Sequence, residues 1–219
     1  MRLIVISPEA EDTREPIVLA QLFAAGLTSY HLRKPAWDRD QLTAWLRAVP
    51  PEFHPRIVLH AHHELATEFS LGGLHDRDSE VRAGPLSPPR STSESPAANS
   101  GPNSPSLPAS LRSRAVHDLP TLRASLEAYD RLLVSPIFPS YSKPGYAPVA
   151  RLAPDELKTV LALPRRAETI ALGGIDASRI SACHELGFDG VAVLGAIWQS
   201  DEPLRAFREL QRALLVHAA

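Results

Sequence analysis

Two apolar stretches near the C-terminus decide the fold. They read Glu168-Thr-Ile-Ala-Leu-Gly-Gly-Ile-Asp176 and Leu186-Gly-Phe-Asp-Gly-Val-Ala-Val-Leu-Gly-Ala-Ile-Trp198. Each contains a short run rich in Ile, Val, Leu and Ala that ends on glycine, which is typical of a parallel strand buried on both faces. Residues 178–186 between them have helical spacing, so the sequence predicts a strand–helix–strand unit.

The glycines that follow these two runs indicate a phosphate site. A glycine after a parallel strand lets a phosphate approach backbone N–H groups without meeting a Cβ atom. Two such turns on the last two strands are how many (β/α)8 barrels hold a phosphate. We therefore expect Gly173, Gly174 and the turn Gly195–Ala196 to bind a phosphorylated small molecule. The alternative is that these glycines only make tight turns.

The same alternation of strand and helix extends back to the N-terminus. Strands are expected at residues 3–6, 29–33, 56–60, 73–76, 113–116, 131–135, 169–172 and 190–194. Helices are expected at residues 16–25, 41–48, 64–70, 119–129, 154–163, 178–186 and 202–217. Eight alternating strands in 219 residues predict one (β/α)8 (TIM) barrel domain over residues 1–219. A doubly wound open sheet is the alternative, but no G-x-G-x-x-G turn follows the first strand to support it.

One segment interrupts this pattern. Fifteen of the 27 residues between Gly84 and Ser110 are Pro or Ser, and only Leu86 and Leu107 are large and apolar. Such a segment cannot bury enough surface to offset the entropy lost on ordering it. We predict a disordered insertion at 84–110 that takes the place of the fourth helix.

The composition excludes several classes of function. A content of 44% hydrophobic and 22% charged residues is that of an ordinary globular domain, and the net charge of −2 favours neither nucleic acid nor an anionic membrane as partner. The apolar run at the N-terminus is too short for a signal peptide, and no stretch has the length of a membrane span. The single cysteine, Cys183, cannot form an internal disulfide, so we expect it to pack in a helix and the protein to be cytoplasmic.

Polar side chains gather at the expected carboxyl ends of the strands, where barrel enzymes place their chemistry. They are His31, Arg33, Lys34, His60, His75, Asp76, Asp78, His117 and Asp118. Arg33, Lys34 and Lys143 are candidates to hold phosphate or pyrophosphate oxygens. His117 is a candidate for proton transfer, because a histidine side chain ordinarily titrates near neutral pH. The histidines at four consecutive strand ends can also bind a divalent metal, or each can pack locally.

The stretch Ser135-Pro-Ile-Phe-Pro-Ser-Tyr-Ser-Lys-Pro-Gly-Tyr146 follows the sixth strand. Long ordered loops at this end of a barrel tend to cover the substrate. The prolines in this stretch favour such a loop, and it presents Ser142 and Lys143 to a ligand. A surface linker is the alternative.

Four blocks resemble the thiamine-phosphate synthase and thiazole tautomerase (TenI) family of (β/α)8 barrels. They are Tyr30-His-Leu-Arg-Lys-Pro35, Ser135-Pro-Ile-Phe-Pro-Ser-Tyr-Ser-Lys143, Ala171-Leu-Gly-Gly-Ile175 and Gly187-Phe-Asp-Gly-Val-Ala-Val-Leu-Gly-Ala-Ile197. The resemblance implies a transferase of thiamine biosynthesis that joins hydroxymethylpyrimidine pyrophosphate to thiazole phosphate and releases pyrophosphate. It also implies Mg²⁺ on the pyrophosphate and a carbocation-like pyrimidine.

The resemblance assigns roles to the candidate residues. Arg33 and Lys34 would grip the pyrophosphate, with His31 and His60 in place of the family's amides. Asp76 or Asp78 would hold the metal, because one of the family's magnesium-binding Asp residues falls on Ala61. On the thiazole-phosphate side the matching residues are Ser142, Lys143, Gly173, Gly174, Gly195 and Ala196.

Two alternatives to a synthase remain open. A tautomerase of this family needs no magnesium and moves a proton with a His at the end of strand five, where His117 stands. The third interpretation is a non-catalytic binder of thiazole phosphate or thiamine phosphate. We expect small phosphorylated molecules as partners in each case, and the sequence allows a homo-oligomer.

Overall fold

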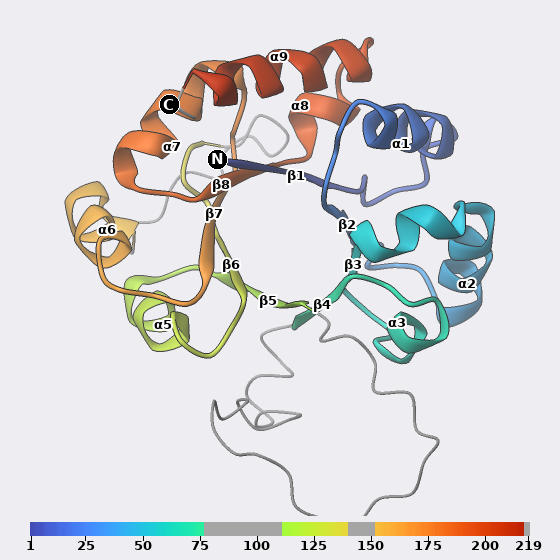
Figure 1. Cartoon of the computed structure of the whole chain (residues 1–219), viewed down its shortest axis with the longest axis horizontal. Coiled ribbons are helices and arrows are strands. Elements are labelled where there is room, and N and C mark those ends of the chain that lie inside the picture. Colours follow the sequence, from blue (N-terminus) through green and yellow to red (C-terminus); the bar gives the residue numbers. More distant parts are fainter. Residues whose placement is uncertain (77–110, 140–151, 217–219) are drawn as a thin grey trace, which may run out of the picture.

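The chain folds into a closed barrel of eight parallel strands that neighbour one another in chain order, β1 to β8, with β8 pairing back to β1 (Figure 1). The computed structural model describes residues 1–76, 111–139 and 152–216. The predicted (β/α)8 architecture is confirmed, and the open-sheet alternative is wrong because the two edge strands pair.

The elements alternate as the sequence predicts. The strands are β1 Arg2–Ile6, β2 Tyr30–Leu32, β3 Ile57–Leu59, β4 Gly73–Asp76, β5 Leu111–Val116, β6 Arg131–Val134, β7 Glu168–Leu172 and β8 Gly190–Val193. The helices are α1 Glu15–Ala24, α2 Arg39–Ala48, α3 Glu64–Glu68, α5 Leu119–Ser125, α6 Pro154–Leu161, α7 Ile180–Leu186, α8 Gly195–Trp198 and α9 Pro203–Leu215, with 3-10 turns η1 Pro51–Arg56 and η3 Ala177–Arg179. The sequence did not predict α8, which is a single turn directly after β8.

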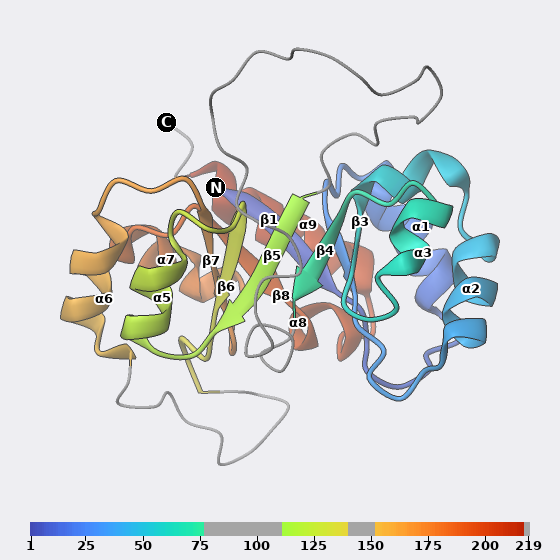
Figure 2. The same cartoon turned by 90° about the horizontal axis from the view of Figure 1, so that it is seen from below.

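The helices lie outside the ring of strands and run beside them (Figures 1 and 2). Local sequence explains where several of them begin and end. The Asp38 carboxylate accepts a hydrogen bond from the Gln41 N–H, and the Asp38 N–H donates to the Gln41 side-chain oxygen. This reciprocal pair is the cap expected for α2. Gly187 ends α7 with φ of +95°, a conformation that glycine adopts without strain. The expected insertion at 84–110 lies outside the described residues.

The core has an outer and an inner layer. Outward-facing apolar residues of the strands, among them Tyr30 and Leu32, pack with the helices in one large cluster. A second, smaller cluster fills part of the barrel interior, and its buried members are Ile4, Ile6, Leu133, Ile170 and Ala192. Cys183 is fully buried in the outer layer, and burial raises the pKa of its thiol to about 12, so the expectation of a packed cysteine is confirmed.

An ion-pair cluster closes the barrel interior at the amino ends of the strands. Glu168 at the start of β7 accepts hydrogen bonds from Arg2 on β1 and from Arg131 on β6, at 2.7 and 2.8 Å. Arg131 is almost fully buried and also donates to the Ser29 hydroxyl. Burial alone would raise the pKa of Glu168, but the hydrogen bonds from Arg2 and Arg131 outweigh it and lower that pKa.

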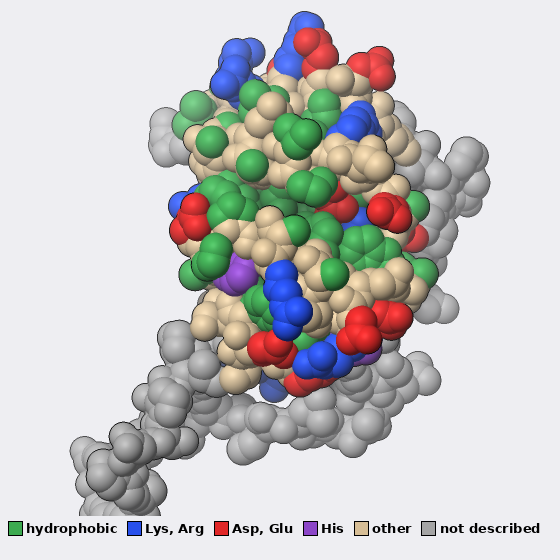
Figure 3. All heavy atoms as spheres, turned by 90° about the vertical axis from the view of Figure 1, so that its right-hand side faces the viewer, with side chains coloured by type: hydrophobic (Ala, Val, Ile, Leu, Met, Phe, Trp, Pro, Cys, Tyr) green, Lys and Arg blue, Asp and Glu red, His purple; other side chains and the backbone are tan. Residues whose placement is uncertain are grey.

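The surface over α1, α2 and α3 carries acidic and basic side chains side by side (Figure 3). This mixture agrees with the small net charge of the chain. None of the helices in the described residues combines the length and the apolarity that crossing a bilayer requires.

We expect Glu168→Gln to destabilise the barrel by about 3 kcal/mol, because it leaves the buried Arg131 guanidinium without a carboxylate. A third of the Glu168 side chain is exposed, so solvent screening keeps the loss at the low end for a buried pair. Urea unfolding measures the change, and Glu209→Gln, which breaks an exposed pair on α9, is the control. Equal stability of the two variants would show that the cluster does not stabilise the fold.

Candidate functional site

The polar residues predicted at the strand ends meet at one mouth of the barrel. His31 lies on β2, His60 directly follows β3, and His75 lies on β4. Arg33 follows β2, and His117 follows β5. On the other side of the same mouth, Gly173 and Gly174 follow β7, and Gly195 and Ala196 begin α8 after β8. Parallel strands in a closed barrel bring all these carboxyl ends together, which is why a sequence pattern could find the site.

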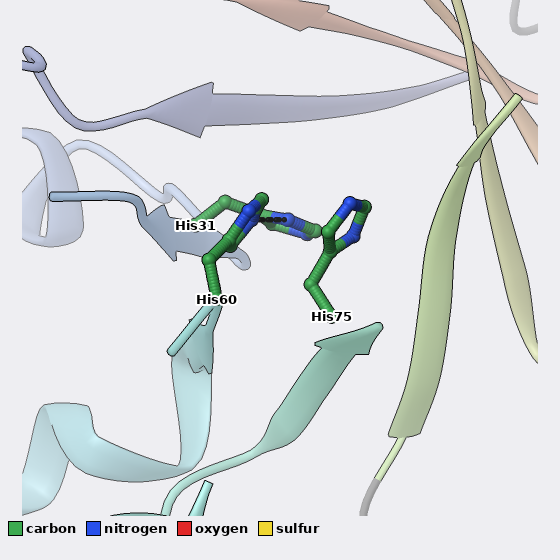
Figure 4. A group of neighbouring side chains, drawn as sticks. All are labelled: His31, His60 and His75. Atoms are coloured by element: carbon green, nitrogen blue, oxygen red, sulfur yellow. Dashed lines mark hydrogen bonds between the residues drawn. The ribbon is translucent and has the colours of Figure 1, made fainter. Parts of the chain in front are cut away.

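Three imidazoles pack together inside this mouth, two of them stacked and the third edge-on to both. His31, His60 and His75 point toward one another from β2, the end of β3 and β4 (Figure 4). Nδ1 of His31 and Nε2 of His60 are 3.0 Å apart, and the rings of His60 and His75 stack with centroids 3.9 Å apart. One ring nitrogen of each residue lies within 4.8 Å of one ring nitrogen of each of the other two.

The hydrogen bonds of the cluster fix one tautomer. The Ser113 hydroxyl on β5 donates to the carbonyl of Leu74, so it accepts from Nδ1 of His75 at 3.0 Å. His75 therefore carries its proton on Nδ1, and Nε2 has the lone pair. Nε2 of His31 is buried and has no hydrogen-bond partner among the described residues.

All three imidazoles are neutral at neutral pH. Burial lowers the pKa of each, and the positive charge that neighbouring histidines would carry lowers it further. The pKa of His75 falls to about 3, and the pKa values of His31 and His60 lie well below their usual range. A neutral imidazole is the form that accepts a proton or a metal ion.

A cavity of about 280 Å³ opens above these rings. Its lining residues are Arg33, Lys34, Pro35, His60, Ala61, His75, Asp76 and Ala115. His31 is fully buried and is not among them, so the expected direct contact of His31 with a substrate does not fit its position. His60 and His75 do line the cavity and can touch a ligand in it.

Arg33 has the position that an anion-binding residue needs. Its backbone N–H donates to the Ser7 hydroxyl, which in turn donates to the Arg33 carbonyl, so the end of β1 fixes the residue. Its guanidinium is partly exposed and pairs with Glu9 at 2.5 Å. An incoming phosphate would share or replace that carboxylate.

Lys34 does not occupy the position that the sequence suggested. Its ammonium group is buried in an ion pair with Glu15 of α1 at 2.6 Å and also donates to the Ala10 carbonyl. Burial raises the pKa of Glu15, although the hydrogen bonds from Lys34 and Tyr30 oppose the rise. The expectation that Lys34 offers a free ammonium to pyrophosphate is therefore wrong, because the charge is already neutralised within the core.

Of the two expected magnesium ligands, Asp76 borders the cavity but directs its carboxylate away from it, toward Arg112. Successive side chains of a strand point to opposite faces, so Asp76 points outward where His75 points inward. The Asp76 carboxylate forms an ion pair with Arg112 there. Asp78 lies outside the described residues. The donors around the cavity are mainly imidazoles and a guanidinium, and such groups do not fit Mg²⁺, which prefers carboxylate and water oxygens.

The two glycine turns differ in what they accommodate. A Cβ at Gly173 would lie 3.0 Å from Pro136, and one at Gly174 would lie 2.3 Å from the Pro139 carbonyl oxygen. Both residues have positive φ, of 96° and 61°. They therefore let the segment after β6 pack on the end of β7, and the tight-turn alternative accounts for their identity.

Gly195 leaves more room. A Cβ there would meet only the flexible side chain of Gln199, at 3.2 Å. The first N–H groups of a helix lack partners within it, so the turn at Gly195 and Ala196 offers N–H groups to an oxyanion. Ser142 and Lys143, the other expected phosphate ligands, lie outside the described residues.

His117 is exposed at the mouth and is held by Ser135, whose carbonyl oxygen and hydroxyl both lie near its Nδ1. Its Nδ1 lies 2.8 Å from the carbonyl oxygen of Ser135 at the end of β6. A carbonyl can only accept, so Nδ1 carries the proton and Nε2 is the acceptor nitrogen. This arrangement suits the proton-transfer role that the sequence predicted for His117.

The sequence analysis did not single out two residues of the site. Ser113 orients His75, and Glu9 pairs with Arg33. Alternation along β5 places Ser113 on the same face as Ala115, and this period-2 pattern could have indicated an inward hydroxyl. No local pattern indicates that Glu9 contacts Arg33, because the two lie on different loops.

Together, the fold and the mouth define a (β/α)8 barrel whose strand ends bring polar side chains and two glycine turns to one mouth. Residues 114–197 match the family model described as thiamine monophosphate synthase. A thiamine-phosphate synthase of Desulfitobacterium hafniense is 37% identical over 82 residues, covering 37% of this chain and 38% of that protein. One of Mycolicibacterium gilvum is 35% identical over 100 residues, covering 44% and 40%.

Solved structures extend the likeness to the whole fold. The thiamine phosphate pyrophosphorylase of Bacteroides thetaiotaomicron superposes with a TM-score of 0.73 at 24% identity, covering 100% of both chains. The 3-hexulose-6-phosphate synthase of Salmonella typhimurium follows with a TM-score of 0.64 at 20% identity, covering 99% of this chain and 100% of that one. Residues 114–197 thus resemble the thiamine-phosphate synthase family, and the rest of the chain shares its fold. The chain spans about two fifths of the length of these curated relatives.

We expect Lys34→Met to destabilise the protein by about 3 kcal/mol, because it leaves the Glu15 carboxylate buried without a cation. Adding Glu15→Gln should restore much of the loss, since the amide oxygen still accepts from Tyr30. Urea unfolding of both variants is the measurement. A Lys34→Met protein with normal stability and lost pyrophosphate binding would place Lys34 in the mouth instead.

We also expect Gly174→Ala to cost more than about 1–2 kcal/mol, because an L-residue is strained at positive φ and its Cβ would meet the Pro139 carbonyl. Gly195→Ala, without positive φ or a rigid neighbour, should change the unfolding free energy far less. Thermal unfolding compares the two. Comparable losses would contradict the packing role of Gly174.

Proposed function

We propose that this chain is a thiamine-phosphate synthase-like transferase, which joins hydroxymethylpyrimidine pyrophosphate to thiazole phosphate and releases pyrophosphate. The main support is the family match at residues 114–197. The strands in this range bring His117, Gly173 and the Gly195–Ala196 turn to the same mouth as Arg33. That mouth offers a cation on one side and helix N–H groups on the other. Two phosphorylated substrates need charge complementarity at both ends.

In this proposal Arg33 binds the pyrophosphate of the pyrimidine substrate. A guanidinium matches two phosphate oxygens at once, and it is already held by Ser7 at the edge of the cavity. The bond between the pyrimidine methylene carbon and the pyrophosphate oxygen breaks, and both electrons leave with the pyrophosphate. Fixed positive charge beside that oxygen stabilises the charge that develops on it.

His60 and His75 form the floor under the departing group, since both line the cavity beside Arg33. Because they are neutral, they contribute dipoles rather than charge there. The Gly195–Ala196 turn receives the thiazole phosphate, together with Ser142 and Lys143. This places the thiazole across the mouth from the pyrophosphate, so that its attack forms the new bond as the old one breaks.

A requirement for Mg²⁺ on the pyrophosphate is part of the proposal, as the family resemblance implies. We assign the ion no protein ligand and derive no step from it, because Asp76 faces outward and pairs with Arg112. A cytoplasmic location is also part of the proposal, as the sequence analysis expects. The tautomerase alternative would use Nε2 of His117, but the similar proteins are thiamine-phosphate synthases, which favours the synthase.

The test is to incubate the purified chain with both substrates, with and without Mg²⁺, and to assay thiamine phosphate and pyrophosphate. We expect both products in equal amounts. No product in either condition, together with tight binding of thiazole phosphate, would overturn the synthase proposal and leave the tautomerase or the binder. Isomerisation of a thiazole carboxylate phosphate without metal would identify the tautomerase.

Variants at the two ends of the mouth should separate the substrates. Arg33→Ala should raise KM for the pyrimidine pyrophosphate by about 10–100-fold, the scale of a hydrogen bond to a charged group, and leave KM for thiazole phosphate nearly unchanged. Gly195→Ala should do the reverse. The control is Arg39→Ala, which removes an exposed arginine of α2 that pairs with Glu68. Equal effects of Arg33→Ala on both substrates would remove Arg33 from this role.

A further inference from the structure

The three-histidine cluster has features that neither packing nor the proposed reaction explains. A barrel interior is normally filled by aliphatic side chains, as it is here on β1, β6, β7 and β8. On β2, β3 and β4 it is filled by imidazoles instead. A buried polar atom without a partner costs about 1–3 kcal/mol, and Nε2 of His31 is such an atom among the described residues.

We propose that His31, His60 and His75 form a binding site for a divalent transition-metal ion, with Zn²⁺ as the first candidate. The proposal goes beyond the proposed transferase activity and does not depend on it. The ion would take one nitrogen from each ring, and its remaining coordination position would face the cavity that His60 and His75 line.

The geometry suits such an ion. Zn–N distances are about 2.0–2.1 Å, so two ligand nitrogens of a tetrahedral site lie about 3.3 Å apart. Nδ1 of His31 and Nε2 of His60 are already 3.0 Å apart, and the three nitrogens lie within 4.8 Å of one another. Binding would require the rings to rotate, since those of His60 and His75 now stack nearly parallel and their lone pairs do not converge. An ion bound between Nδ1 of His31 and Nε2 of His60 would replace the hydrogen bond that now joins these two residues.

The chemistry of the donors selects the kind of metal. Imidazole nitrogen suits Zn, Co, Ni and Cu, whereas Mg²⁺ and Ca²⁺ prefer oxygen ligands. The rings are neutral, so no net charge has to be lost, but the proton between Nδ1 of His31 and Nε2 of His60 must move to the other nitrogen of its ring before both can bind the ion. Three histidines with one open position toward a cavity is the ligand set of a catalytic rather than a structural zinc site. That open position would take water or an oxygen of an anion held by Arg33.

The surroundings of His75 resemble those of a metal ligand. Metal-binding histidines almost always donate their second ring nitrogen to a fixed acceptor, which orients the ring. His75 donates from Nδ1 to the buried Ser113 hydroxyl, and Ser113 is itself fixed by the Leu74 carbonyl. Nε2 of His75 is left with its lone pair. Ser113 is therefore a positioning residue for the site.

The test measures metal directly. The purified chain is treated with a chelator, dialysed against Zn²⁺ or Co²⁺ and analysed by elemental mass spectrometry. We expect about one ion per chain, visible absorption bands of tetrahedral Co²⁺, and a higher unfolding temperature with Zn²⁺ than with Mg²⁺. Failure of the native chain to retain zinc, or octahedral Co²⁺ bands alone, would overturn the proposal.

Variants locate the ion. His60→Gln and His75→Gln should lose the bound metal and the Co²⁺ bands, whereas His184→Gln, an exposed histidine on α7, should keep both. Ser113→Ala keeps all three ligands and should weaken Zn²⁺ binding by about 10–100-fold, which decides the matter even if a histidine variant fails to fold. Unchanged zinc affinity in Ser113→Ala and in both histidine variants would overturn the site. Because the readout is metal content, the result is independent of whether thiamine phosphate forms.

Discussion

The need to fill the interior of a closed eight-strand barrel governs this structure. Closure leaves no edge strand, but it directs every second side chain of every strand into one narrow space that must be packed. In this chain, aliphatic residues of β1 and β6 to β8 fill one side of that space, and imidazoles of β2 to β4 fill the other. At the amino end the Arg2–Glu168–Arg131 cluster completes the filling. The site is therefore an extension of the core.

This arrangement controls where charge can lie. Burial keeps the three imidazoles neutral, so the interior tolerates them without counterions. Full charges are either paired, as Lys34 is with Glu15, or moved to the rim, as Arg33 is. Lys34 and Arg33 are neighbours in sequence and both border the cavity, but the Lys34 ammonium is buried against Glu15 of α1 whereas the Arg33 guanidinium stays partly exposed. Only the rim residue remains available to a phosphate.

The sequence predicted the barrel, its strand ends and the gathering of histidines, because these depend on local patterns that repeat along the chain. It could not predict the partner of Lys34, since Glu15 lies on α1 and no short-range pattern links them. It misjudged Asp76 for a different reason. Counting residues to the end of a strand places a side chain at the mouth, but the period of two decides whether it points in or out. Gly173 and Gly174 do follow β7 as expected, but their positive φ and their contact with the segment after β6 explain the glycines without a phosphate.

The two halves of the mouth have different relations to the family. The match at residues 114–197 includes His117, Gly173 and Gly195, which lie on the side where we propose that the thiazole phosphate binds. His31, His60 and His75 all lie outside that match, on strands β2 to β4. A barrel assembles its site from separate strand ends, so one half can keep its ligand while the other changes its donors. Here the changed half carries neutral nitrogen donors where a magnesium pyrophosphate site calls for carboxylate oxygens. Any metal preference of the mouth would therefore follow from its own side chains, independently of the phosphate site that we propose for the opposite half.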